Sequence, residues 1–211
     1  MKTTLLLIRH GESEGNLRRV FCGNTDIPLT ERGRQQAACT GEFLKDRTIH
    51  AVYSSPLSRA YDTALAVAAH HGLPVTPEPD LAEICGGRWE GLSFTEIAER
   101  YPESYAVWQT NIGRCQCPEG ESVLSVQTRL YACAQRLAAA HPGQTVCLAT
   151  HAMAIRCLVG AVEHRTLDEL HSMPWVSNAS VTTLSWEDGI FTLERYSEDD
   201  HMTGLVTRFN G

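Results

Sequence analysis

The most constraining feature of the sequence is the short apolar run of residues 3–8, which ends abruptly in Arg9-His10-Gly11. Six apolar or β-favouring residues in a row are typical of a strand that is buried on both faces of a sheet. In an open α/β sheet, ligands bind just beyond the carboxyl ends of the strands, so His10 is expected where chemistry takes place. Gly11 lets the backbone turn sharply or approach a ligand closely, because it has no Cβ.

Two later segments repeat this arrangement. Residues 50–53 form a short apolar run that leads through a Ser-Ser pair to Arg59, and residues 145–149 form a strongly apolar run that is followed by His151. Segments with helical periodicity separate these runs, which predicts a three-layer α/β/α sandwich with a mostly parallel central sheet. Because parallel strands share one carboxyl edge, the polar side chains that follow the three runs are expected to converge there.

Caps and periodicity predict the remaining elements. Thr30, Ser55 and Ser93 have the side chains of helix N-caps, with Pro56 at the first helical position after Ser55. Helices are predicted over residues 30–45, 56–71, from 93 onward, 121–141 and 152–162, a short strand over 74–77, and paired strands over 180–186 and 191–195. Residues 78–92 are predicted as a loop, and residues 101–120 as irregular or weakly helical.

The chain shows no internal repeat, linker or low-complexity tract, which predicts one domain over residues 1–211. Residues from about 92 to 120 are expected to cover the active site as a subregion of that domain. No signal peptide or membrane span is read from the sequence, and several of the eight cysteines fall in predicted helices and strands. We therefore expect reduced thiols and a cytoplasmic location.

Net charge and cysteine spacing exclude other kinds of ligand. The formal charge of −7 argues against nucleic acid or an anionic membrane as the main partner. An anionic substrate would need a local basic cluster. Cys115 and Cys117 are too close in sequence for the usual zinc pairing, so no metal and no cofactor is expected. The oligomeric state cannot be read from the sequence.

Two arginines and two histidines at one sheet edge suit a tetrahedral dianion such as a phosphoryl group. Guanidinium groups match phosphate oxygens in bidentate geometry and stay charged at physiological pH. Their charge disfavours the protonated form of His10, which keeps its imidazole neutral and nucleophilic. Such an imidazole can accept a phosphoryl group and pass it to water without a metal. Glu83, in the loop after the third predicted strand, is the best-placed proton donor for the leaving oxygen.

Six motifs run in order along residues 5–156. They are Leu7-Ile8-Arg9-His10-Gly11-Glu12-Ser13 with Asn16; Asp26-x-Pro28-Leu29-Thr30-x-x-Gly33; Tyr53-Ser54-Ser55-Pro56-Leu57-x-Arg59-Ala60-x-x-Thr63-Ala64; Leu81-x-Glu83-x-x-x-Gly87-x-Trp89-Glu90-Gly91; Gly120-Glu121-Ser122; and Thr150-His151-x-x-x-Ile155-Arg156. This series resembles the histidine phosphatase superfamily, which comprises cofactor-dependent phosphoglycerate mutases and related phosphatases. The resemblance implies a phosphoglycerate mutase-like fold.

The resemblance also implies a role for each matching residue. His10 is the nucleophile that becomes phosphorylated, and Glu83 is the acid/base. The phosphoryl group is held by Arg9, Arg59 and His151. The phosphate pocket is lined by Asn16, Cys22, Gly23 and Ala152. Two of these depart from the family pattern: Cys22 stands where a polar Thr or Gln is common, and Ala152 where glycine is common.

The expected activity is that of a metal-independent phosphomonoesterase of broad specificity, which acts through a phosphohistidine on small phosphorylated metabolites. The expected ligands are such a metabolite or inorganic phosphate. A cofactor-dependent phosphoglycerate mutase is the main alternative. It is disfavoured because Glu83 to Gly91 has the phosphatase-like sequence and only about 28 residues separate Gly91 from Gly120. A pathway-specific phosphatase, such as an alpha-ribazole phosphatase, and a non-catalytic phosphoprotein-binding module are further alternatives.

Other hydrolase chemistries fit the sequence less well. Residues 11–15 match the G-x-S-x-G pattern of a nucleophile elbow, but the sequence has no earlier strand and loop that would supply an oxyanion hole. No cysteine has an arginine six positions later, and neither an Asp-x-Asp motif nor a P-loop occurs. Trp89, Trp108 and Trp175 are expected to pack rather than to recognise a ligand, and Arg156 to form a structural ion pair beneath the site.

Overall fold

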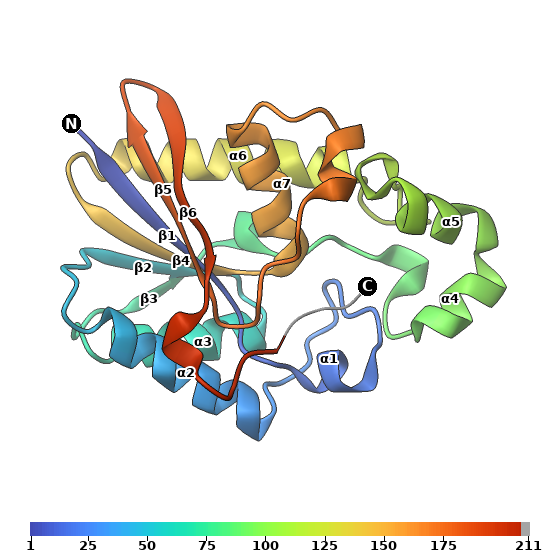
Figure 1. The fold of residues 1–211 in the computed structure, drawn as a ribbon, viewed down its shortest axis with the longest axis horizontal. Coiled ribbons are helices and arrows are strands. Elements are labelled where there is room, and N and C mark those ends of the chain that lie inside the picture. Colours follow the sequence, from blue (N-terminus) through green and yellow to red (C-terminus); the bar gives the residue numbers. More distant parts are fainter. Residues whose placement is uncertain (208–211) are drawn as a thin grey trace.

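The computed structural model describes residues 1–207 of the chain and is built on a six-stranded sheet in the order β3-β2-β4-β1-β5-β6 (Figure 1). The strands are β1 Thr3–Arg9, β2 Ala51–Ser54, β3 Val75–Pro77, β4 Thr145–Thr150, β5 Val181–Glu187 and β6 Ile190–Glu198. The first four strands pair in parallel, while β5 is antiparallel to β1 and to β6. The predicted mostly parallel sheet is confirmed.

Helices cover both faces of this sheet. The α-helices are α1 Glu14–Arg18, α2 Glu31–Leu44, α3 Ser58–Ala68, α4 Phe94–Arg100, α5 Pro102–Thr110, α6 Val123–Ala140 and α7 Ala152–Val162. Short 3₁₀ turns are η1 Pro79–Leu81, η2 Gly87–Trp89, η3 Ile112–Arg114, η4 Asp168–Ser172 and η5 Asp200–Met202. Helices α2 and α3 lie on one face and α6 and α7 on the other (Figure 1). The predicted three-layer α/β/α architecture is therefore confirmed.

The apolar run of β1 joins the two cores. Leu5 and Leu7 pack into the core beneath α6 and α7, whereas Leu6 and Ile8 pack into the core beneath α2 and α3. Successive side chains of a strand point to opposite faces, so a strand between two helical layers must be apolar throughout. Each of these four side chains is at most 1% exposed, and burial of such a side chain contributes about 2 kcal/mol.

Most predicted helix starts agree with the structure. Thr30 caps α2 by accepting a hydrogen bond from the Gly33 N–H, and Ser93 forms the predicted capping box with Glu96 at the start of α4. Helix α7 has its predicted bounds, and β5 and β6 form the predicted antiparallel pair, with β5 shifted by one residue and β6 longer than expected.

The predicted start of α3 was wrong. The helix begins at Ser58 rather than Pro56, and Ser55 is not its cap. The Ser55 hydroxyl accepts instead from the Leu57 N–H in a local turn and lies 2.8 Å from His151 Nε2. Asp26, from a loop distant in sequence, accepts hydrogen bonds from the Ser58 N–H and hydroxyl at 2.8 and 2.7 Å. This long-range cap has no local sequence signal.

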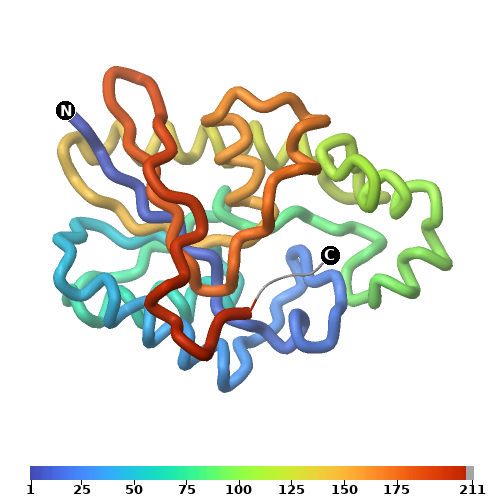
Figure 2. Tube along the Cα trace, in the orientation of Figure 1, coloured from blue at the N-terminus to red at the C-terminus, as the bar shows by residue number. Residues whose placement is uncertain are grey.

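The segment expected to be irregular or weakly helical between residues 101 and 120 contains the regular helix α5, which has Pro102 in its first turn. Figures 1 and 2 show this part of the chain, in green, beyond the carboxyl ends of the parallel strands, at the same end of the sheet as α1. Within residues 1–207, none of the helices combines the length and the apolar character that a bilayer crossing requires.

Candidate active site

A cavity of about 90 Å³ lies at the carboxyl ends of the parallel strands. Eight of the nine predicted site residues line it: Arg9, His10, Asn16, Cys22, Gly23, Arg59, Glu83 and Ala152. The ninth, His151, is fully buried beside the cavity, with its ring centroid 5.1 Å from that of His10 in an edge-to-face arrangement. The topology thus brings together the side chains that follow three separate strands.

His10 is held as a neutral imidazole. Its Nδ1 lies 2.7 Å from the Gly11 carbonyl oxygen, which can only accept, so Nδ1 carries the proton and Nε2 carries the lone pair. The side chain is 4% exposed, and burial, followed by the charges of Arg59 and Arg9, lowers the pKa of His10 well below its usual value. An unprotonated Nε2 therefore persists at neutral pH.

The two arginines are fixed by backbone carbonyls rather than by carboxylates. Arg9 Nη1 donates to the Val176 carbonyl at 2.6 Å, and Arg59 donates to the carbonyls of Thr25 and Gly23 at 2.8 and 2.6 Å. Among the described residues, neither Nε has a hydrogen-bond partner. Burial lowers the pKa of Arg9 to about 10, which still leaves the group charged at neutral pH. Both charges thus remain available to an anionic ligand.

His151 is a second buried histidine, beside His10. Its Nε2 lies 2.8 Å from the Ser55 hydroxyl oxygen, and its Nδ1 is buried without a partner among residues 1–207. Burial and the charge of Arg59 lower the pKa of His151 well below its usual value. The neutral ring follows β4, as the sequence predicts.

Glu83 reaches the cavity from the loop after η1. Its carboxyl group accepts from the N–H groups of Ile84, Met153 and Ala154 at 3.0 to 3.2 Å, the last two from the first turn of α7. Burial nevertheless raises the pKa of Glu83 above its usual value, because these hydrogen bonds and the arginine charges only partly offset desolvation. A carboxyl group with a raised pKa beside a nucleophile is suited to general acid/base catalysis.

Asn16 is oriented by a small polar network. Its Oδ1 accepts from the Ser13 N–H and hydroxyl and from Asn178 Nδ2, while Asn178 Nδ2 also donates to the His10 carbonyl. This leaves the Asn16 amide nitrogen available as a donor to a ligand. Ser13 acts as the N-cap of α1, so it does not have the setting of a nucleophile elbow.

Two glycine positions allow the loops to meet. A Cβ on Gly11 would lie 2.3 Å from the Gly33 carbonyl oxygen, and a Cβ on Gly23 would lie 2.1 Å from Glu90 Oε1. Gly23 also has a φ of +43°, which disfavours other residues. The Glu90 carboxylate accepts from the backbone of Asn24, Thr25 and Gly86 and from the Thr25 hydroxyl. Glu90 thereby fixes the loop whose carbonyls hold Arg59.

Several residues of the cavity wall were not predicted. They include Phe94 from α4, Trp108 from α5, Met153 from α7 and Trp175 from the segment before β5. The packing interpretation holds for the fully buried Trp89 but is incomplete for Trp108 and Trp175, whose rings pack 6.4 Å apart and also face the cavity. No local signal marks these residues, because the wall forms only when distant segments meet.

The prediction of an ion pair for Arg156 was wrong. Its Nη2 donates to the carbonyls of Leu170 and Met173 at 2.7 and 2.9 Å, and its guanidinium lies 4.0 Å from the centre of the Trp175 ring. None of its contacts among the described residues is with a carboxylate. Carbonyls and an aromatic face take the place of the expected acid.

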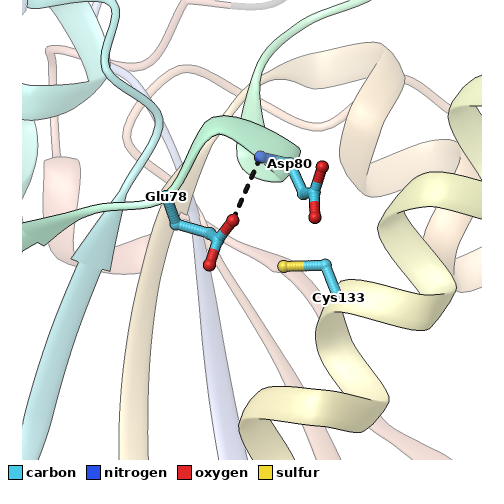
Figure 3. A group of neighbouring side chains, drawn as sticks. All are labelled: Glu78, Asp80 and Cys133. Atoms are coloured by element: carbon cyan, nitrogen blue, oxygen red, sulfur yellow. Dashed lines mark hydrogen bonds between the residues drawn. The ribbon is translucent and has the colours of Figure 1, made fainter.

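In the described part of the chain, one group of potential metal ligands lies outside the cavity, at Glu78, Asp80 and Cys133 (Figure 3). Arg136 Nη2 donates to Glu78 Oε2 at 2.9 Å and to Asp80 Oδ2 at 3.4 Å, so a guanidinium already supplies positive charge there. Burial raises the pKa of Cys133 to about 12, which disfavours the thiolate that binds metals. The donor set does not fit a resident metal ion.

Comparison with known proteins agrees with the geometry of the cavity. The model of the histidine phosphatase superfamily (branch 1) matches residues 5–199. Phosphoserine phosphatase 1 of Hydrogenobacter thermophilus is 33% identical over 184 residues, which is 87% of each chain. The metal-independent phosphoserine phosphatase of Arabidopsis thaliana is 31% identical, covering 96% of this chain and 84% of its own. The solved structure of Bacillus stearothermophilus YhfR has a TM-score of 0.91 at 33% identity, over 94% of this chain and 98% of that one.

The chain therefore belongs to the histidine phosphatase superfamily, as its six motifs indicate. It is an enzyme of the phosphatase class, with the phosphoglycerate mutase-like fold that the resemblance implies.

Proposed function

We propose that this enzyme is a metal-independent phosphomonoesterase of broad specificity for small phosphorylated metabolites. The observation that carries the proposal is the state of His10: a buried, neutral imidazole with a free Nε2 between two arginines that have no carboxylate partner in the described chain. Two relatives named as phosphoserine phosphatases, one of them metal-independent, support this proposal and make phosphoserine the first metabolite to test.

In the proposed reaction, Arg9, Arg59, His151 and Asn16 bind the phosphoryl oxygens. His10 Nε2 attacks phosphorus, the bond from phosphorus to the ester oxygen breaks, and the Glu83 carboxyl donates its proton to that oxygen. Glu83 then takes a proton from water, which attacks the phosphohistidine and releases inorganic phosphate. Cys22, Gly23 and Ala152 complete the pocket wall, and residues from about 92 to 120 cover it through Phe94 and Trp108.

The test is hydrolysis of p-nitrophenyl phosphate and phosphoserine in excess EDTA by the wild-type protein, His10→Ala and His50→Ala. His50 is an exposed histidine outside the cavity and serves as the matched control. We expect turnover that survives EDTA, falls at least about 1,000-fold in His10→Ala and stays unchanged in His50→Ala. Undiminished turnover in His10→Ala would contradict the phosphohistidine route.

Failure to hydrolyse any phosphomonoester would favour one of the alternatives. Turnover of 3-phosphoglycerate only with a bisphosphate primer would indicate a mutase, and tight binding of a phosphopeptide without turnover would indicate a binding module.

Hydrolysis with a strong preference for alpha-ribazole phosphate over other esters would replace broad specificity by a pathway-specific activity. The single domain and the cytoplasmic location stay predictions.

A further inference from the structure

A second, larger cleft adjoins the phosphate cavity. Its volume is about 790 Å³, against about 90 Å³ for the cavity, and the two share the aromatic side chains Phe94, Trp108 and Trp175. A phosphoryl group bound near His10 fills much of the small cavity, so a long leaving group must extend past these aromatic rings. The cleft is therefore the space into which such a group continues.

The charge of the cleft is opposite to that of the whole chain. It is lined by Arg18, Arg19, Arg156 and His171, and no carboxylate side chain is among the described residues that line it. The chain as a whole carries a net charge of −7. A local basic surface on an acidic protein concentrates anions where it lies, because nearby charges dominate the field at a cleft.

Arg156 supplies a cation at the boundary with the cavity. Its side chain is 2% exposed and lies against Trp175, which belongs to both walls. Only its Nη2 is hydrogen-bonded, and its Nε and Nη1 have no partner within residues 1–207. A buried guanidinium with unused donors and no carboxylate leaves positive charge uncompensated in the wall.

Arg19 supplies a second cation at a defined place. It is the C-cap of α1 with a φ of +55°, and its N–H bonds to the carbonyls of Asn16 and Gly15. Its backbone is thus tied to the loop that carries Asn16 into the phosphate cavity. Its exposed side chain forms no ion pair with the described residues, whereas the neighbouring Arg18 lies 3.7 Å from Glu14.

We propose that this cleft binds a second anionic group, a phosphate or a carboxylate, at the far end of the leaving group. The proposal rests on the proposed phosphatase function and names its substrate class: elongated phosphomonoesters with two anionic ends. The chain between these ends lies on Phe94, Trp108 and Trp175. Arg19, with Arg18 and His171, binds the distal anion, and the buried charge of Arg156 adds positive potential from the wall between cleft and cavity.

The first experiment compares substrates that differ only in their distal end. Alkanediol monophosphates of about three to eight carbons are compared with the corresponding bisphosphates and with ω-phosphooxy carboxylates, and kcat/KM is measured from released phosphate. We expect the anionic ends to raise kcat/KM about tenfold at a favoured length, beyond the twofold statistical advantage of a bisphosphate. Whether the bisphosphate or the carboxylate gains more identifies the distal anion.

The second experiment assigns the effect to the cleft. Arg19→Glu is compared with Arg195→Glu, which makes the same charge change at an exposed arginine of β6 outside the cleft. We expect Arg19→Glu to remove most of the preference for anionic ends, measured as the ratio of kcat/KM for anionic to neutral ends within each variant, and Arg195→Glu to retain that ratio. High salt should weaken the preference in the wild-type protein.

Two results would overturn the cleft proposal while the phosphatase function stands. One is equal kcat/KM for neutral and anionic ends at every length. The other is a preference that Arg19→Glu and Arg195→Glu change equally, which would show an effect of net charge only. A protein that hydrolyses no monophosphate at all would contradict the phosphatase function itself.

Discussion

The phosphate cavity and the adjoining cleft share three aromatic side chains, yet their cations are built in different ways. In the cavity, Arg9 and Arg59 are at most 3% exposed and are fixed by backbone carbonyls. In the cleft, Arg18, Arg19 and His171 are exposed, and only Arg156 is buried. The arginine charges are therefore fixed and desolvated in the cavity and mostly exposed to water in the cleft.

This difference assigns catalysis to the cavity and substrate selection to the cleft. Buried charges that are fixed before the reaction stabilise the charge of a transition state without reorganisation. Exposed charges that contact a remote part of the substrate bind it equally before and during reaction. Substitutions in the cavity should thus affect every substrate, whereas substitutions in the cleft should affect only substrates with a distal anion.

The largest effect is expected for Glu83→Gln, which keeps the shape but removes the proton donor. Turnover of phosphoserine should fall about 100- to 10,000-fold, with a smaller loss for p-nitrophenyl phosphate, because a phenolate leaves without full protonation. Both are measured as kcat/KM, which reports the step that forms the phosphohistidine, with Glu31→Gln, an exposed residue of α2, as the control. Equal losses for the two leaving groups would argue against Glu83 as the acid.

The pH profile of the same variant tests the sign of two pKa shifts. Turnover needs unprotonated His10, whose pKa is lowered, and protonated Glu83, whose pKa is raised. The wild-type rate should fall at low pH as His10 protonates and at higher pH as Glu83 ionises. In Glu83→Gln the high-pH decrease should disappear, since glutamine does not titrate.

An intermediate effect is expected for Glu90→Gln. One carboxylate oxygen that accepts hydrogen bonds becomes an amide nitrogen, so the backbone around Gly23 and Thr25 loses part of its support. We expect kcat/KM to fall about tenfold and the free energy of unfolding to fall by about 1–3 kcal/mol. Substrates with a neutral distal end and substrates with an anionic distal end should be affected alike. A loss confined to substrates with an anionic distal end would instead assign Glu90 to the cleft and contradict the division of roles between cavity and cleft.

The smallest effect is expected in stability against pH. His10 and His151 are buried, and their pKa values in the folded protein lie well below the unfolded value of about 6.5. Below pH 6.5 the unfolded chain therefore binds more protons than the folded one, and stability decreases as the pH is lowered, by up to about 1.4 kcal/mol per pH unit for each histidine. Urea unfolding between pH 7.5 and 5.5 should show this decrease, and His10→Ala should show a shallower one. Parallel curves for the two proteins would contradict a buried, neutral His10.

Local sequence rules predicted the elements that carry the chemistry. The strands β1 and β4 are apolar on both faces, which predicts their burial between two helical layers. The direction of the parallel strands predicts that the polar residues after them lie at one edge of the sheet. Helix α7 has its predicted bounds because a strand and a histidine precede it and its residues, apart from Arg156, are apolar. Where a long-range contact replaced a local one, prediction failed: Asp26 caps α3 in place of Ser55, and Trp175 with two carbonyls partners Arg156 in place of an acid.

By itself, the sequence determined the sheet, its helical layers and the set of cations and imidazoles at one sheet edge, because strand burial and parallel topology follow from local patterns. Only the tertiary structure decided the state of those groups. The tautomer of His10, the raised pKa of Glu83 and the carbonyl contacts of the arginines depend on how much water is excluded and which backbone groups come near. The basic cleft depends on packing in the same way, since Arg19, Arg156 and His171 meet only when α1, α7 and η4 fold together.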